Sequence, residues 1–399
     1  MTERDLTTER DAWIALASTP GVGDVTFERL LATFGSARAA LETVARLPHA
    51  RADEVLAQRL RARPRPGVAA AIRRGAADPG RTRRRMEALG GWVLTPLDPA
   101  YPPRLHLLED PPTLVFGMGS QASLSGARLV AVVGTRRPTG AGRNLATRIA
   151  ARLAEAGATV VSGLAVGVDG AAHLGALDAG GDTIAVVGSG LDDPGPAVHR
   201  RLARAIVSAG AVISELAPGV RATQGTYPRR NRIISALAGA TIVVEAPARS
   251  GALITARHAL EQGRQLLVAP GRPLDPAVAG NLALLRETPA RALVGLDEMI
   301  VDLGLDAAMA AAEHSGDASS LPLSADAALG LLAGAEQAVA RALCGGPRTV
   351  DGLVHASGQP PGVVAAALTI LQLRGWARVL GALHLPAGPL VNAHPGSVA

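Results

Sequence analysis

Residues 126–305 alternate short apolar runs with helical patterns, and this alternation limits the possible folds more than any other feature. The runs are β-branched, bounded by glycine and apolar throughout, as in strands that are buried on both faces. Strand–helix alternation with one short glycine loop per crossing predicts a doubly wound, mostly parallel α/β sheet. The predicted strands are 129–133, 159–162, 183–187, 211–214, 241–244 and 265–268, with a weaker one at 292–294.

The segments on either side of this region have different patterns. The N-terminal part is helical, and its turn Pro20-Gly21-Val22-Gly23 resembles a helix–hairpin–helix. The C-terminal part has three helical segments followed by a hairpin, as in a winged helix. The predicted organisation is a helical domain at 1–90, an extended Rossmann-like domain at 91–305 with an extended lead-in at 91–125, an Ala-, Ser- and Gly-rich linker at 306–333, a winged helix at 334–386 and a disordered tail at 387–399.

The start of the chain and its cysteine content narrow the class of protein. The first residues are polar and mixed in charge, unlike a signal peptide, and no apolar run approaches the roughly 20 residues of a membrane span. The single cysteine, Cys344, excludes an internal disulfide, a zinc cluster and dithiol chemistry. We therefore expect a cytoplasmic protein without a membrane partner.

All 40 basic residues are arginines, and the formal net charge is +6. Arginine suits bidentate contact with phosphate and stacks on bases. Residues 51–85 hold 11 arginines against three acids, a local net charge of +8. Such a block attracts a polyanion or forms a solvated surface, and the lack of interleaved aromatic residues favours the solvated surface.

Glycine-rich loops follow the predicted strands at the edge where ligands bind in open parallel sheets. The first, 134–143, offers small residues, hydroxyls, backbone N–H groups at a helix start and arginine, which together make a phosphate cradle. The second, 162–170, permits close approach of a ligand to the backbone. The predicted ligand contacts from these loops are Gly134, Thr135, Arg136, Arg137, Arg143, Ser162, Gly163, Leu164, Gly188, Ser189, Gly190, Ser250 and Gly251.

An arginine-rich segment, 225–235, opens the helical pattern after the fourth predicted strand. Tyr227 is its lone aromatic residue, and Arg229, Arg230, Asn231 and Arg232 follow within five residues. An aromatic side chain beside an arginine cluster at a helix start describes a site for phosphates and a stacked base. The alternative is an arginine-rich capping loop anchored by Tyr227.

The motifs of the common nucleotide and catalytic sites are missing. Leu145 stands where the dinucleotide fingerprint needs a third glycine, and the second predicted strand ends at Ser162 in place of an acid. A chain without lysine cannot contain a P-loop, and Ser189 lacks the surroundings of a nucleophile elbow. Asp169 and His173 are interpreted as a helix cap and a packed side chain, not as an acid–base pair or metal ligands. We predict a binding protein with no catalytic residue, metal or cofactor.

Five motifs in order over about 120 residues make the sequence similar to the DNA-processing protein A family, also called DprA or Smf. The resemblance extends to the helical N-terminal region, the proline-rich lead-in and the winged helix. Its motifs are Gly134-Thr135-Arg136, 162–169 with His173, 188–192, 228–234 and 250–256.

The resemblance implies a non-enzymatic, usually dimeric protein that binds single-stranded DNA. It further implies protection of incoming strands in natural transformation, and loading of the RecA recombinase onto DNA covered by single-strand-binding protein. Arg136 and the Gly163-Leu164 loop would line the pocket, and the cluster Arg229–Arg232 would hold phosphates. The chain departs from the family pattern at Val166, Gly170 and the closing segment 288–290, and Tyr227 replaces a more usual Phe.

Two other functions compete with this prediction. Related α/β proteins of the phosphoribohydrolase type use a Pro-Gly-Gly-x-Gly-Thr loop, which the corresponding residues 248–252 lack. A transcription regulator would read duplex DNA through the winged helix, but the third helical segment, 363–368, carries almost no polar side chains. Single-stranded DNA binding is therefore the favoured prediction.

Overall fold

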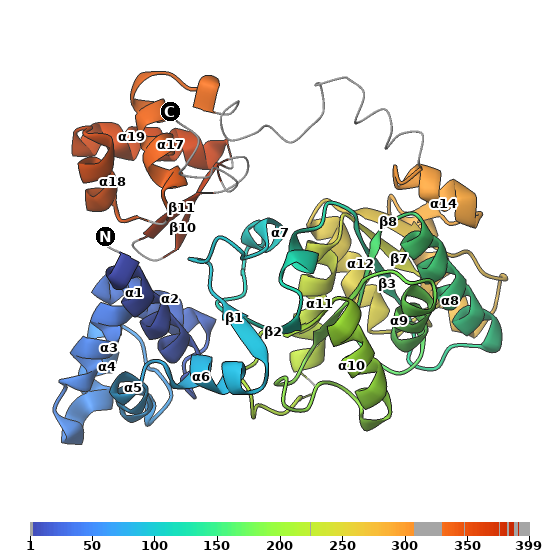
Figure 1. The fold of residues 1–399 in the computed structure, drawn as a ribbon, viewed down its shortest axis with the longest axis horizontal. Helices are drawn as coiled ribbons and strands as arrows, with labels where there is room; N and C mark the ends of the chain where they lie inside the picture. Colours follow the sequence, from blue (N-terminus) through green and yellow to red (C-terminus); the bar gives the residue numbers. More distant parts are fainter. Residues whose placement is uncertain are drawn as a thin grey trace. The chain divides into compact units, whose positions relative to one another are not determined.

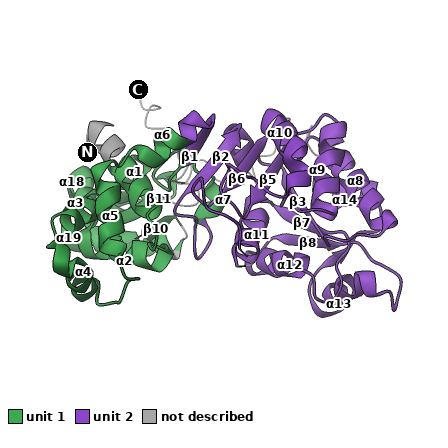
Figure 2. Cartoon of the chain, turned by 90° about the horizontal axis from the view of Figure 1, so that it is seen from below, with its two compact units in different colours: residues 1–85, 94–106, 318–399 green, residues 86–93, 107–317 purple. Residues whose placement is uncertain are grey.

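A computed structural model describes residues 3–223, 225–306, 329–346, 348–374, 376–380, 383–386 and 390. The chain forms two compact units (Figure 2): unit 1 comprises residues 1–85, 94–106 and 318–399, and unit 2 comprises 86–93 and 107–317. The predicted linker at 306–333 and tail at 387–399 lie mostly outside the described residues.

Unit 2 is built on a nine-stranded sheet in the order β1-β2-β6-β5-β4-β3-β7-β8-β9 (Figure 1). The pairs from β6 through β9 are parallel, and β2 joins β6 antiparallel. This confirms the predicted doubly wound, mostly parallel sheet. The strands are β1 (Gly91–Leu94), β2 (Val115–Gly119), β3 (Leu129–Val133), β4 (Thr159–Ser162), β5 (Thr183–Val187), β6 (Ala211–Ser214), β7 (Ala240–Val243), β8 (Gln265–Val268) and β9 (Arg291–Ala292).

The strand order reverses at β3, which pairs with β4 on one side and with β7 on the other. Val130 lies opposite Val160 and also opposite Ala240, so both neighbours run parallel to β3. The connections from β3 and β7 leave for opposite faces, which opens a crevice at their carboxyl ends. This switch point positions the candidate site.

Helices cover both faces of the sheet (Figure 2). On one face α8 packs on α9 and α9 on α10, while α11 and α12 pack together on the other. Ile149 and Leu153 of α8 meet Val160 and Ile242 of the sheet in a fully buried core. The helices of unit 2 are α8 (Gly140–Glu155), α9 (Val168–Asp178), α10 (Arg200–Ala209), α11 (Thr226–Leu237), α12 (Ala252–Glu261), α13 (Ala279–Glu287) and α14 (Leu296–Asp302), with short turns η2 (Ala122–Ser125), η3 (Ala197–His199) and η4 (Pro276–Val278).

The lead-in contributes more than the extended connection that the sequence predicts, because β1 and β2 extend the sheet beyond β6. The Trp92 indole donates a hydrogen bond to the carbonyl of Gly119 at 2.8 Å. Its ring fills the space beside Gly117, where any Cβ would collide with it. A large aromatic side chain opposite a glycine thus seals this edge of the sheet.

Unit 1 contains the predicted helical domain. Trp13 and Phe27 meet edge to face with ring centroids 4.9 Å apart, and both are fully buried. The Glu9 carboxylate accepts hydrogen bonds from the N–H groups of Ala37 and Arg38 and so satisfies the start of α3. The helices are α1 (Glu3–Ala17), α2 (Asp24–Phe34), α3 (Ala37–Ala45), α4 (Ala52–Leu60), α5 (Val68–Ala77) and α6 (Arg81–Ala88), with the turn η1 (His49–Arg51) and the short α7 (Pro103–His106).

The C-terminal part of unit 1 is the predicted winged helix. Its hairpin pairs Ala377 with Pro386, and its core gathers Leu343, Leu353 and Val364. Among the described residues, no helix is long and apolar enough to span a bilayer. The elements are α17 (Gly334–Cys344), α18 (Val350–Ser357), α19 (Pro361–Leu373), β10 (Ala377–Leu380) and β11 (Leu383–Pro386).

Candidate nucleic-acid interface

A cavity of about 460 Å³ lies at the switch point. Four segments converge on it from the carboxyl ends of the strands, as the sequence predicts for an open parallel sheet. They are the loop after β3, the loop after β4, the first turns of α11 and the loop that leads into α12. The lining residues are Val133, Gly134, Thr135, Arg136, Ala165, Asp169, Tyr227, Pro228, Arg230, Asn231, Ile234, Pro247, Arg249, Ser250, Gly251, Ala252, Ile254 and Thr255.

Arg136 and Tyr227 form a pair in this lining. The Arg136 guanidinium carbon lies 5.0 Å from the centroid of the Tyr227 ring, a cation–π contact. Both side chains are exposed, Tyr227 at 36%. A pre-assembled pair of a charge and an aromatic face suits a phosphate and an adjacent planar group.

Arg230 lies in the floor of the cavity. The helix α11 begins at Thr226, within the predicted arginine-rich segment, and buries Arg230. Its guanidinium donates to the carbonyl oxygens of Gly163, at 2.6 Å, and Val186. Glycine at 163 leaves room for this guanidinium, because a Cβ there would overlap it unless the Arg230 side chain moved. The Arg230 guanidinium therefore donates to carbonyl oxygens at the ends of β4 and β5.

Asp169 is the carboxylate of this floor. It lies in the first turn of α9, whose N-cap is Gly167, so Asp169 is not the cap that the sequence predicts. Its carboxylate accepts the Ala165 N–H at 3.4 Å. Burial raises the pKa of Asp169, and the nearby Arg230 opposes the rise. Burial likewise lowers the pKa of Arg230, against the attraction of Asp169.

His173 is packed, as the sequence predicts, and its tautomer follows from its partners. Its Nδ1 lies 2.7 Å from the Thr183 hydroxyl, which already donates its proton to the Val160 carbonyl. The histidine must therefore donate from Nδ1. Its Nε2 is buried with no hydrogen-bond partner among the described residues. Burial lowers the pKa of His173 to about 3, so the ring is neutral at pH 7.

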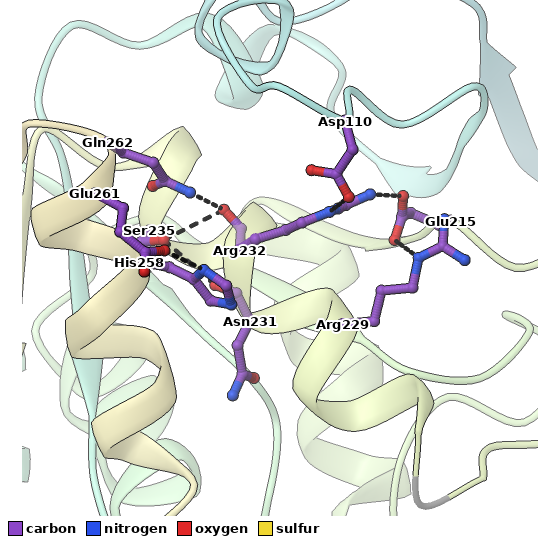
Figure 3. Close-up of polar contacts among 9 residues, drawn as sticks. All are labelled: Asp110, Glu215, Arg229, Asn231, Arg232, Ser235, His258, Glu261 and Gln262. Atoms are coloured by element: carbon purple, nitrogen blue, oxygen red, sulfur yellow. Dashed lines mark hydrogen bonds and ion pairs between the residues drawn. The ribbon is translucent and has the colours of Figure 1, made fainter. Parts of the chain in front are cut away.

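Arg232 is a structural cross-link (Figure 3). It is 5% exposed and contacts Glu215 after β6 at 2.6 Å and Asp110 of the lead-in at 2.8 Å. Burial alone would lower the pKa of Arg232, but the two carboxylates outweigh burial and raise it. Arg229 lies on the other side of Glu215 at 3.9 Å and remains exposed (Figure 3). Of the three predicted phosphate-binding arginines in this segment, the structure leaves Arg229 on the surface and buries two.

Glu245 is a site residue that the sequence reasoning missed. Its carboxylate accepts the Thr139 N–H at 2.9 Å and the Thr139 hydroxyl at 2.7 Å. Thr139 in turn caps α8 by accepting the Gly142 N–H. Glu245 therefore fixes the loop after β3 from the end of β7, across the switch point. The sequence signal that could identify Glu245 is an acidic residue directly after an apolar strand.

Five of the remaining predicted contacts lie in the cavity lining. Gly134, Thr135, Ser250 and Gly251 line the cavity, and Asn231 lines it while donating to the Gly251 carbonyl at 3.3 Å.

Other predicted residues lie outside the lining. Arg137 and Arg143 are exposed on the loop after β3 and on α8. Gly188 lies beside Tyr227, where a Cβ would be 3.2 Å from the ring atom Cδ1. The Ser189 hydroxyl donates to the Asp193 carbonyl, and the Gly190 N–H donates to the Val220 carbonyl. Ser162, Gly163 and Leu164 are buried beneath the cavity.

The charged side chains of the cavity are mostly cationic. Arg136 and Arg249 are exposed in its lining, and Arg230 balances Asp169 in its floor. Within the part of the chain that the structure describes, no three His, Cys, Asp or Glu side chains gather as metal ligands. The arrangement can hold an anion together with a planar group.

Comparison with known families covers most of the chain. Residues 92–304 match DNA recombination-mediator protein A, residues 7–71 a DprA-like N-terminal HHH domain, and residues 323–382 a DprA winged helix domain. The Escherichia coli (strain K12) protein Smf is 37% identical over 308 residues, which are 74% of this chain and 79% of that protein.

Two solved structures are similar as well. DNA processing protein A (DprA) from Streptococcus pneumoniae has a TM-score of 0.55 and 28% identity, covering 70% of this chain and 98% of that one. DNA processing protein A from Helicobacter pylori, described in terms of its single-stranded DNA binding mode, has a TM-score of 0.49 and 30% identity. That match covers 53% of this chain and 95% of that one.

Proposed function

The chain belongs to the DNA recombination-mediator protein A family, and from this premise we propose that it binds single-stranded DNA in the switch-point cavity. Membership in the family gives the chain a role in DNA processing and recombination. The finer proposal concerns which nucleic acid it holds, where it holds it and to what end.

The Arg136–Tyr227 pair is the observation that carries the proposal. Stacking on an aromatic ring is available only to a base that is free of its partner strand, and every base has a face that can stack. The adjacent guanidinium of Arg136, 5.0 Å from the ring, supplies a cation for the neighbouring phosphate. A single strand presents both groups in sequence, whereas duplex DNA keeps its bases stacked inside.

The rigid frame of the cavity supports binding without chemistry. Asp169, His173 and Arg230 are buried and hydrogen-bonded to other parts of the frame, and Glu245 is hydrogen-bonded to Thr139. These groups hold the binding surface in shape and leave no catalytic role for themselves. We therefore propose a non-enzymatic protein that takes no cofactor.

The biological role that we propose is protection of single strands and their transfer to the RecA recombinase, from DNA covered by single-strand-binding protein. A homodimer in the cytoplasm is the expected form. The family resemblance supports these partners, and a pull-down of RecA by the DNA-bound protein tests them. Recovery of equal RecA with a protein that cannot bind DNA would separate the two activities.

A competition assay tests the proposed function. Labelled single strand is challenged with unlabelled single strand or duplex at two salt concentrations. We expect single strand to compete far better, and Tyr227→Ala to weaken binding by roughly 1–3 kcal/mol, about 5- to 150-fold in Kd. Tyr227→Phe keeps the ring and should bind like the wild type.

Arg148→Ala is the matched control for Arg136→Ala, because Arg148 is an exposed arginine on α8 that does not line the cavity. Equal affinity of the Arg136, Tyr227 and Arg148 alanine variants would refute the cavity as the binding site. Multiple turnovers of a nucleoside monophosphate would instead favour the phosphoribohydrolase alternative.

A further inference from the structure

The positive charge of this chain is concentrated away from the cavity. Residues 1–85 of unit 1 hold 16 arginines and 10 acidic residues, a net charge of +6, which equals the net charge of the whole protein. Unit 2 supplies the proposed single-strand site but contributes nothing to this excess. The excess positive charge of residues 1–85 therefore needs a separate explanation.

Several arginines of this region are already paired. Arg51 binds Glu54 at 2.7 Å, Arg83 binds Asp11 at 2.8 Å, and Arg84 binds Asp78. Arg73 donates to the carbonyls of Ala45 and Leu47. These contacts explain part of the block as structural.

Four of the arginines without a partner stand at alternate positions: Arg59, Arg61, Arg63 and Arg65, which we call the arginine turn. All four are exposed, and none makes a side-chain hydrogen bond or ion pair with any described residue. The acids nearby are already used, since Glu54 binds Arg51 and Asp53 binds backbone N–H groups. Four like charges within seven residues are thus left without a counter-charge.

The backbone of the arginine turn is nevertheless fixed. Arg61 ends α4 in the left-handed region, at φ 48°, and its N–H bonds the Gln58 carbonyl. Asp53 accepts the N–H groups of Gly67 at 2.6 Å and Ala69 at 2.9 Å, and so holds the start of α5. A flexible loop would relieve the repulsion by spreading, but this one is anchored at both ends.

We propose that the arginine turn binds the phosphate backbone of DNA, as a second contact separate from the cavity of unit 2. A polyanion supplies the missing counter-charges together, and arginine contacts phosphate oxygens in a bidentate manner. An anchored turn loses little backbone freedom on binding, which favours the contact. This inference goes beyond the proposed function, because it concerns other residues in another unit and does not require a stacked base.

The test replaces the four arginines of the turn with glutamine in the full-length chain. Its matched control makes Arg148→Gln, Arg201→Gln, Arg204→Gln and Arg257→Gln, which removes the same charge from exposed positions of unit 2. Affinity for a long single strand and for a duplex is measured against salt. Each lost phosphate contact should flatten the log–log salt slope by about 0.7 for single strands and 0.9 for duplex.

We expect the turn variant to lose roughly 2–3 units of slope on single strands, and the control to keep a slope near that of wild type. Loss with both DNA forms, or with one, identifies which backbone the turn contacts. Equal slopes and affinities for the turn variant and the control would overturn the proposal, and an acidic protein partner would then be the better explanation.

Replacing the four turn arginines with lysine shows whether weaker binding comes from lost charge or from misfolding. Lysine keeps the charge, so this variant should retain most of the slope, and a loss as large as that of the glutamine variant would also overturn the proposal. The experiments distinguish failure of the cavity proposal from failure of the arginine-turn proposal. Tyr227→Ala removes the stacking in the cavity, while the turn variant leaves the cavity intact.

Discussion

Arg136 and Arg230 carry the same guanidinium group but lie in opposite environments. Arg136 is exposed against Tyr227, whereas Arg230 is 6% exposed and bound to two backbone carbonyls. The sequence shows both as arginines near glycine loops and assigns both to a phosphate. Only the start of α11 at Thr226 fixes which way each position of that helix faces.

Arg230→Ala is expected to destabilise unit 2. It leaves the carbonyls of Gly163 and Val186 without their donor and Asp169 without a nearby cation, for a loss of about 2–5 kcal/mol in the free energy of unfolding. Urea denaturation measures it. Arg229→Ala is the matched control, because Arg229 is exposed, and similar losses in both variants would contradict a structural role for Arg230.

His173 should make the protein sensitive to acid. Its pKa is about 3 when folded and about 6.5 when unfolded, so the unfolded chain binds more protons between these values. Stability is therefore complete above pH 6.5 and falls as the pH drops towards 3, by up to about 1.4 kcal/mol per pH unit.

Denaturation midpoints against pH measure this effect in wild type and in His173→Asn. Asparagine can donate to Thr183 but does not titrate, so the variant should lose part of the slope. His106 of unit 1 also has a pKa lowered to about 3 by burial, and its share of the slope should persist. Identical slopes in wild type and variant would show that His173 does not become charged on unfolding.

Elements were easier to predict than the side chains that join them. The strands β3, β4, β5, β6 and β8 have the predicted bounds, because glycine-bounded β-branched runs mark buried parallel strands directly. The strand β2 was missed because it joins β6 from a distant, proline-rich segment. The ion pairs of Arg232 could not be predicted, because its two carboxylate partners come from other segments of the chain.

The hydrogen bonds between Glu245 and Thr139, which we call the clamp, join the end of β7 to the start of α8. Glu245→Ala removes the acceptor of the Thr139 N–H and hydroxyl, and should cost about 1–3 kcal/mol of stability. It should also weaken single-strand binding, because the loop that carries Arg136 loses its support. Fluorescence titration with an oligonucleotide measures the binding.

Thr139→Ser keeps the hydroxyl that bonds both Glu245 and Gly142, so this control should remain close to wild type in stability and binding. Undiminished affinity of Glu245→Ala would mean that the loop after β3 keeps its shape without the clamp.

At the scale of the whole molecule, two sites in different units predict a dependence on strand length. On this proposal a short oligonucleotide fills one site, whereas a long strand has enough phosphates to bind both. Linked contacts on one strand raise the overall affinity beyond that of either contact. The glutamine variant of the turn should therefore weaken binding of the long strand and leave the short one unchanged, as titrations over a series of lengths would show. Equal weakening at every length would contradict two separate contacts.

The switch point also has a consequence for how unit 2 folds. The first and last lining residues of the cavity, Val133 and Thr255, enclose the four strands β4 to β7 between them, and β3 cannot meet β7 until that intervening chain exists. Such distant pairings form late and slowly, because the loop between them must close first. A nascent or truncated chain therefore has no cavity. A bound strand would stabilise only those molecules that have completed folding, and it would slow their unfolding.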